Sequence, residues 1–123
     1  MLEPAQIIQI LEGHSDQQTF AAGEVIFQQG ETGDLMFGIL SGTVEMQVDG
    51  KVVETLEAGD VFGEGALLHS DKLRYSTAIA KTDCKLAALT EHHFLFAIQE
   101  TPMFALDVMR SYSDRLRNLK AQL

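Results

Sequence analysis

Residues 43–56, which read TVEMQVDGKVVETL, predict a β-hairpin and with it the fold class of the chain. Val44, Met46 and Val48 alternate with polar residues, which is the period of a strand that buries one face. The Asp-Gly pair at positions 49 and 50 supplies the two residues with positive φ that a type I′ turn requires. On both sides of this hairpin, turn residues recur about every eight to twelve positions, as is typical of a β-sandwich or barrel.

The segments outward from the hairpin predict a mainly β chain with helices at its two ends. Residues 35–40 are almost continuously apolar, so this strand is predicted to be covered on both faces. Pro4 suits the first turn of one helix, Thr90 caps a second, and Pro102 fits the first turn of the last. The predicted strands are 24–27, 35–41, 43–48, 51–56, 74–80 and 84–89, and the predicted helices are 1–13, 91–100 and 102–123.

The composition indicates one domain that does not bind polyanions. The 123 residues are enough to bury a core, and we expect a single domain with a lead-in over 1–19, a β region over 20–89 and C-terminal helices over 90–123. The net charge of −9 disfavours nucleic acid and anionic membranes as partners. Cys84, the one cysteine, lies in an apolar alternation and is predicted to be a buried strand residue. With no signal peptide or membrane-length apolar stretch recognised, we expect a cytoplasmic setting.

One segment interrupts the strand pattern with residues suited to an anionic ligand. Residues 62–68 read FGEGALL, and a one-turn helix starting at Gly65 would direct free N–H groups at an anion. Arg74 is the only arginine outside the last helix, and its planar fork of donors suits a phosphate. Glu64 can accept a hydrogen bond from a sugar hydroxyl. The residues alone leave an alternative open, in which Glu64 and Arg74 pair with each other and only close a loop.

Residues 23–34, GEVIFQQGETGD, and the segment 62–80 together resemble the cyclic nucleotide-binding domain family. The first stretch is similar to the family's glycine-punctuated early strands, and the second to its phosphate-binding cassette. The resemblance extends from about Phe20 to Leu119. It implies a mainly β fold, a β-roll of the double-stranded β-helix or jelly-roll type, with a short N-terminal helix, a one-turn cassette helix and two C-terminal helices. It also implies a cyclic nucleotide, cAMP or cGMP, as the ligand held in the roll.

The resemblance implies a role for each candidate site residue. The carboxylate of Glu64 and the amide of Gly63 would take the ribose 2′-hydroxyl, and Arg74 would neutralise the cyclic phosphate. Two backbone amides would donate to phosphate oxygens, a leucine would wall the purine, and an arginine of the last helix would pair with Glu64. Tyr75 and Leu119 depart from the family's pattern, because hydroxyl or polar residues usually stand there. The ligand-binding candidates are Gly63, Glu64, Gly65, Ala66, Arg74, Tyr75, Ser76, Leu56 (the purine wall) and Arg115 (the partner of Glu64), with the amides being those of Ala66 and Tyr75.

Three functions of different classes follow. The first is a sensor that binds a cyclic nucleotide, expected to be cAMP, signals through its last helix and catalyses nothing. The second is a ligand-free interaction domain on the same fold, or a homodimer, that uses the heptad face Met109, Tyr112, Leu116, Leu119 and Leu123. The third is a cupin-type metal enzyme. We expect no metal and no cofactor, because none of the four histidines, His14, His69, His92 and His93, lies in a predicted strand.

Overall fold

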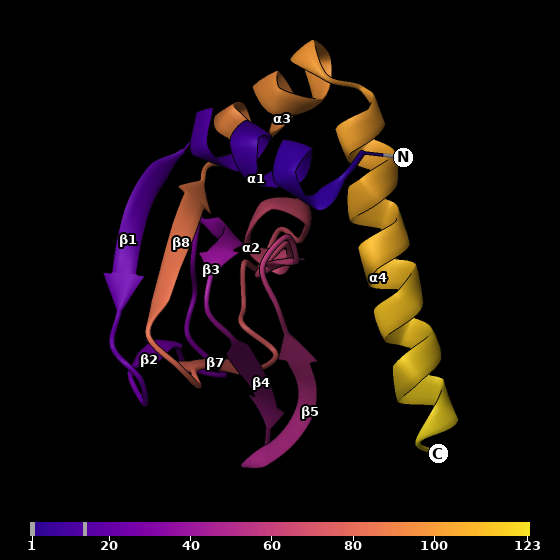
Figure 1. The fold of residues 1–123 in the computed structure, drawn as a ribbon. Coiled ribbons are helices and arrows are strands. Elements are labelled where there is room, and N and C mark those ends of the chain that lie inside the picture. The colour runs from indigo at the N-terminus through magenta and orange to yellow at the C-terminus, as the bar shows by residue number, and fades with distance from the viewer. Residues whose placement is uncertain (1, 14) are drawn as a thin grey trace.

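The computed structural model describes residues 2–13 and 15–123, and its elements form a β-roll with helices at one end and along one side (Figure 1). The helices are α1 (Pro4–Gly13), α2 (Gly65–Leu68), α3 (Glu91–Glu100) and α4 (Met103–Ala121). The strands are β1 (Asp16–Phe20), β2 (Val25–Phe27), β3 (Met36–Ser41), β4 (Val44–Val48), β5 (Lys51–Leu56), β6 (Val61–Phe62), β7 (Thr77–Ala80) and β8 (Cys84–Leu89).

The strands form two antiparallel sheets that enclose the main core. One sheet has the order β1-β8-β3-β6 and the other β2-β7-β4-β5. Phe37, Phe62 and Leu86 of the first sheet pack with Val44 and Met46 of the second in one buried cluster. Since each sheet buries one face on the other, the mainly β fold and the β-roll predicted from the sequence are confirmed.

The hairpin predicted at residues 43–56 is confirmed in detail. β4 pairs with β5 in an antiparallel register that ends at Val48 opposite Lys51. Asp49 and Gly50 between them have φ values of 51° and 81°, the positive angles of the predicted turn. β3 is buried on both faces, as its apolar run predicted, and Cys84 is buried at the start of β8.

Two strands were not predicted, and a third was predicted too long. β1 carries only one apolar residue, Phe20, and is an edge strand that pairs with β8, so its sequence lacks a strong alternation. The roll therefore begins at Asp16 rather than at the predicted residue 20. β6 has two residues, too few to show any period. β7 starts at Thr77 and not at position 74, because Arg74 pairs its backbone with the loop residues Gly30 and Glu31.

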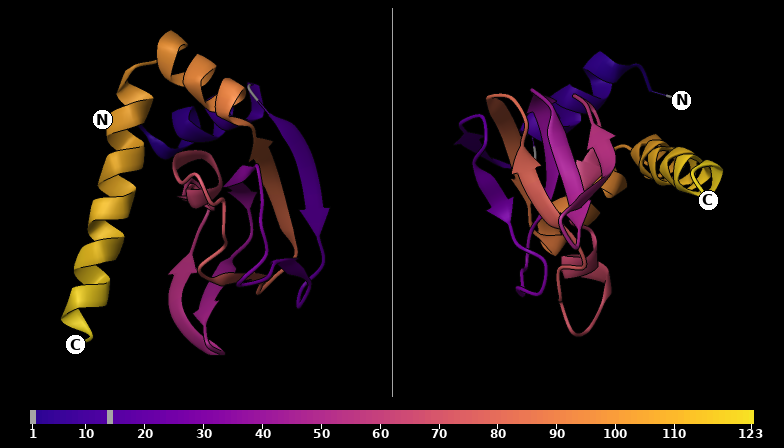
Figure 2. Two further views of the ribbon diagram at one scale, coloured as in Figure 1. Left: turned by 180° about the vertical axis from the view of Figure 1, so that it is seen from behind. Right: turned by 90° about the horizontal axis from the view of Figure 1, so that it is seen from below.

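The helices cover the upper end of the roll and one side of it (Figure 2). Ile7 and Leu11 of α1 pack with Leu89, Ala97 and Phe104 in a second buried cluster. α4 then runs down beside β5, away from the rest of the helices (Figure 1). None of the described helices combines the length and the apolar character that a membrane crossing requires.

Thr90 caps α3 as predicted, and its removal has a measurable cost. The Thr90 hydroxyl accepts the His93 N–H at 3.1 Å, a donor that the helix itself leaves without a partner. Thr90→Ala is expected to lower the free energy of unfolding by about 1 kcal/mol. Thr90→Ser keeps a capping hydroxyl, so its free energy of unfolding should stay close to that of the unmodified protein. Urea denaturation measures both, and equal stability of Thr90→Ala and the unmodified protein would contradict the capping role.

Candidate functional site

The segment that follows β6 forms a turn and a single helical turn, as the sequence predicted. Gly63 has a φ of 79°, which reverses the chain direction at the end of β6. Glu64 follows in a helical conformation, and α2 begins at Gly65. The Ala66 N–H, an expected phosphate donor, bonds the Gly63 carbonyl at 3.3 Å within this turn.

The Arg74 side chain is buried against backbone rather than exposed. Only 7% of Arg74 is accessible. Its Nη1 donates to the Gly63 carbonyl at 2.9 Å and its Nη2 to the Leu35 carbonyl at 2.7 Å. Its guanidinium carbon lies 4.1 Å from the centre of the Phe27 ring. Neutral carbonyls and one aromatic face therefore hold a positive charge in place.

Two glycines leave the space that the guanidinium fills. A Cβ atom at Gly33 would overlap Arg74 Nη2, and one at Gly63 would lie 2.9 Å from Arg74 Nη1. Burial lowers the pKa of Arg74, while the carboxylates of Asp34, Glu64 and Glu31 oppose that shift. An arginine stays charged under such a shift.

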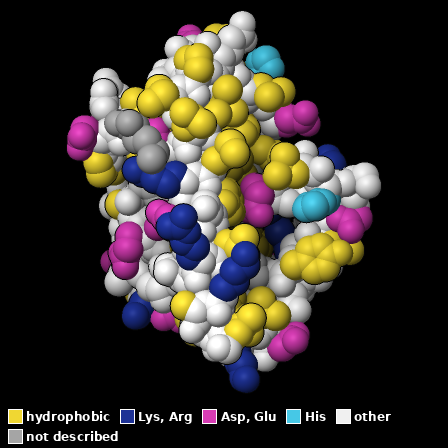
Figure 3. All heavy atoms as spheres, turned by 90° about the vertical axis from the view of Figure 1, so that its right-hand side faces the viewer, with side chains coloured by type: hydrophobic (Ala, Val, Ile, Leu, Met, Phe, Trp, Pro, Cys, Tyr) yellow, Lys and Arg dark blue, Asp and Glu magenta, His cyan; other side chains and the backbone are white. Residues whose placement is uncertain are grey.

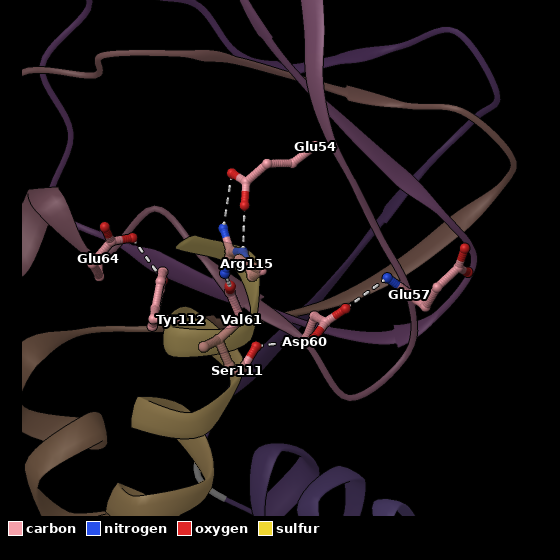
Figure 4. A network of polar contacts seen from close by, with 8 residues as sticks. All are labelled: Glu54, Glu57, Asp60, Val61, Glu64, Ser111, Tyr112 and Arg115. Atoms are coloured by element: carbon pink, nitrogen blue, oxygen red, sulfur yellow. Dashed lines mark hydrogen bonds and ion pairs between the residues drawn. The ribbon is translucent and has the colours of Figure 1, made fainter. Parts of the chain in front are cut away.

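Glu64 bonds a tyrosine of α4, so the alternative of a Glu64–Arg74 pair is not what the structure contains. The Tyr112 hydroxyl donates to Glu64 Oε2 at 2.6 Å (Figure 4). Burial, followed by the charge of Glu64, raises the pKa of Tyr112 far above its ordinary value. The hydroxyl therefore stays protonated and acts as the donor to the carboxylate.

The predicted pairing of Arg115 with Glu64 is wrong. Arg115 Nε and Nη2 donate to the two carboxylate oxygens of Glu54 at 2.6 and 3.2 Å, and Nη1 donates to the Val61 carbonyl at 2.6 Å. Tyr112 lies nearly one helical turn before Arg115, which brings Tyr112 to the cassette and Arg115 to β5 (Figure 4). Burial opposes the charge of Arg115, but the hydrogen bonds and charge of Glu54 outweigh it and raise the pKa of Arg115.

Almost all of the predicted binding residues line one hollow of about 150 Å³ between the cassette and the roll. Tyr75 stands at the rim of this hollow, because the residue is 70% exposed and its hydroxyl lies 3.4 Å from Asp71 Oδ2. The predicted residues that line this hollow are Gly63, Glu64, Gly65, Ala66, Arg74, Tyr75, Ser76 and Arg115.

Leu56 is the predicted site residue that the structure places elsewhere. It is 1% exposed and belongs to the core between the sheets. The purine-wall role predicted for Leu56 stays a prediction, because Leu56 does not line the cassette hollow. It instead lines a neighbouring hollow of about 240 Å³ between β5 and α4, together with Asn118 and Gln122. Glu54 and Arg115 line both hollows, which makes the two adjoin.

Sequence reasoning missed Glu54 and the role of Tyr112 at the site. Tyr112 was assigned to a partner-facing heptad seam, yet its hydroxyl points inward to Glu64. Tyr112 lies three residues before Arg115, so the two side chains are neighbours on the surface of one helix. This spacing was the signal from which a role for Tyr112 at the site could have been predicted. Glu54 lies in β5, outside both segments that carry the family resemblance (23–34 and 62–80), so nothing in the sequence marks it.

The histidines do not form a metal centre among the described residues. No group of three or more His, Cys, Asp or Glu side chains gathers in residues 2–13 and 15–123. His92 and His93 lie in α3, and His69 follows α2 at the edge of the cassette hollow. His14, the remaining candidate, lies outside the described residues.

Comparisons with known proteins point to one family. The family model for the cyclic nucleotide-binding domain matches residues 17–101. The chain is 33% identical over 120 residues to the cAMP-dependent protein kinase regulatory subunit of Schizosaccharomyces pombe, a match that covers 90% of this chain and 28% of that protein. It is 36% identical over 76 residues to the cGMP-dependent protein kinase of Toxoplasma gondii, covering 62% of this chain and 8% of that protein.

The fold also has solved counterparts. The chain matches the catabolite activator protein of Thermus thermophilus with a TM-score of 0.74 and 28% identity, covering 98% of this chain and 58% of that one. The chain spans less than a third of the length of the curated relatives that it matches.

Proposed function

The chain belongs to the cyclic nucleotide-binding domain family, and from this premise we propose that it is a sensor that binds cAMP and signals through α4 without catalysing a reaction. One observation carries the proposal: Arg74, Glu64 and the Gly63–Ala66 turn converge on a single hollow. We further propose that residues 1–123 act as one domain, and the cytoplasmic setting stays a prediction.

The charges at the hollow support an anionic ligand with a hydroxyl group. A guanidinium has five N–H donors, and the Gly63 and Leu35 carbonyls each take one of those of Arg74. Arg115 adds a second cation to the lining. The charge of Arg115 is paired with Glu54, so Arg74, which is bonded to neutral carbonyls, is the cation that attracts a phosphate locally. Glu64 supplies the acceptor that a ribose hydroxyl needs.

The size of the site supports a nucleotide rather than phosphate alone. The cassette hollow of about 150 Å³ adjoins the β5–α4 hollow of about 240 Å³ through Glu54 and Arg115. Together they reach the lower end of the range of roughly 300–1,000 Å³ typical of small-molecule sites. We assign the phosphate and ribose to the first hollow and the base to the second, where Asn118 and Gln122 offer amide groups.

The choice of cAMP over cGMP rests on relatives. The match to the S. pombe cAMP-dependent kinase subunit covers 90% of this chain, whereas that to the T. gondii cGMP-dependent kinase covers 62%. Because this choice rests on relatives alone, the experiment below tests both cAMP and cGMP.

A second candidate, a ligand-free interaction domain or homodimer, is favoured by an apolar surface. Hydrophobic side chains gather where α3 and α4 face outward (Figure 3). Met109 and Leu116 are 66% and 52% exposed, and an apolar groove of about 600 Å³ lies between α2, α3 and α4. Of the predicted heptad face, Tyr112 and Leu119 are partly buried, so the outward part is Met109, Leu116 and Leu123.

A thermal-shift titration tests the proposed function. At about one hundred times its Kd, a ligand stabilises the folded state by about 2.7 kcal/mol, which raises Tm by several degrees. We expect cAMP to give the largest shift, cGMP a smaller one and 5′-AMP little, because its phosphate is not cyclic. If millimolar concentrations of both cyclic nucleotides leave Tm unchanged, the interaction domain becomes the better assignment.

A further inference from the structure

α4 is held to the rest of the protein by a row of polar contacts on one face. Asp107 Oδ2 accepts the Leu2 N–H at 3.0 Å, and Ser111 Oγ donates to Asp60 Oδ1 at 3.0 Å. Tyr112 and Arg115 continue the row to Glu64 and Glu54 (Figure 4). Two of the carboxylates in this row, Glu54 and Glu64, also line the cassette hollow, whereas Asp60 does not.

Glu64 stands between two spaces and presents a different side to each. Its side chain lines both the cassette hollow and the apolar groove beneath α4. Tyr112 lines the groove and not the cassette hollow, so its hydroxyl reaches Glu64 Oε2 from the groove side. A carboxylate accepts at both oxygens, which leaves Oε1 for a donor in the hollow.

The Tyr112 ring is itself held firmly. The Arg115 guanidinium carbon lies 4.4 Å from the ring centre, and Arg115 is fixed in turn by both oxygens of Glu54. A short hydrogen bond from a fixed ring restricts the rotamers of the carboxylate that accepts it. Ser111 differs, because its hydroxyl donates to Asp60, which also accepts the Glu57 N–H.

We infer that Tyr112 is the positioning residue of Glu64: its hydroxyl holds one carboxylate oxygen so that the other accepts the ribose hydroxyl of the ligand. The inference rests on the proposed function and names the residue that links the site to α4. Because the ligand and α4 then bind the same carboxylate, each stabilises the other's contact, and this coupling is reciprocal.

A cycle of two variants and two ligands tests this inference. Calorimetry compares cAMP with 2′-deoxy-cAMP on the unmodified protein, Tyr112→Phe and Ser111→Ala. We expect Tyr112→Phe to weaken cAMP about fivefold and 2′-deoxy-cAMP hardly at all, since only the former donates to Glu64. Ser111→Ala removes a contact from the same helix turn without touching Glu64, so the preference for the 2′-hydroxyl should be unchanged.

A second variant keeps the test decisive if Tyr112→Phe lowers stability. Glu64→Gln keeps the shape of the side chain but removes its charge, so the 2′-hydroxyl preference should shrink and adding Tyr112→Phe should then have no further effect. If Tyr112→Phe weakens both ligands equally, or behaves like Ser111→Ala, Tyr112 is structural only and the inference is overturned. If the unmodified protein binds neither cAMP nor cGMP, the proposed function fails and the inference falls with it.

Discussion

Replacing Arg74 by alanine is expected to weaken cAMP binding by about one to two powers of ten, the largest effect on affinity in this protein. A charge-assisted hydrogen bond to a phosphate contributes about 1.5–3 kcal/mol, and Arg74 is the one arginine in the roll. Calorimetry measures the loss directly. Arg117→Ala, which removes the same charge from an exposed position of α4, serves as the matched control and should leave the affinity nearly unchanged.

The same variant should also lose stability, and the two effects need separate measurements. Without Arg74, the Gly63 and Leu35 carbonyls lose a donor inside the protein, which costs about 1–3 kcal/mol each where water cannot replace it. Urea denaturation reports this loss independently of the ligand. A folded Arg74→Ala protein with unchanged cAMP affinity would remove Arg74 from the phosphate site.

The second large effect is expected for Phe62→Ala, which should lower the free energy of unfolding by about 3–5 kcal/mol. Phe62 is fully buried, and its ring centre lies 5.5 Å from that of Phe37 and 6.0 Å from that of Phe27. Phe27 also lies beneath the Arg74 guanidinium, and Gly63 follows Phe62 directly. The cavity should therefore loosen the cassette as well as the core.

Chemical denaturation of Phe62→Ala measures the stability loss, and Phe96→Ala provides the control. Phe96 in α3 is 44% exposed, so its truncation should cost less than about 1.5 kcal/mol. Comparable losses for the two variants would mean that the ring cluster at Phe62 contributes no more than a surface aromatic, contrary to the packing described above.

The parts of the fold that could be predicted are those with a local physical signal. The hairpin at 43–56 combines alternation with a turn that only Asp-Gly type pairs adopt readily, and Thr90 is a helix cap by chemistry alone. β1 and β6 carry no such signal. Their pairing partners, β8 and β3, lie far along the chain, so tertiary contacts rather than local sequence make them strands.

The site was predictable where a residue was unusual in its surroundings. Arg74 stands out because it is the one arginine in a β region, and the Gly63–Ala66 turn because it breaks the strand pattern. The partner of Glu64 was not predictable in the same way. Whether Tyr112 or Arg115 reaches the cassette depends on the rotation of α4 against the roll, and a heptad pattern alone places Tyr112 on the wrong face.

The surroundings of Arg74 limit how a protein of this kind can acquire a new ligand preference. The guanidinium is enclosed by two carbonyls, by the Phe27 ring and by the space that Gly33 and Gly63 leave, so few neighbouring side chains can be exchanged there. We therefore expect changes in selectivity to come from β5 and the end of α4, where the side chains of Val52, Asn118 and Gln122 border the outer hollow. In the proposed site, the part that holds the anion should therefore tolerate few substitutions, whereas the part assigned to the base should tolerate more.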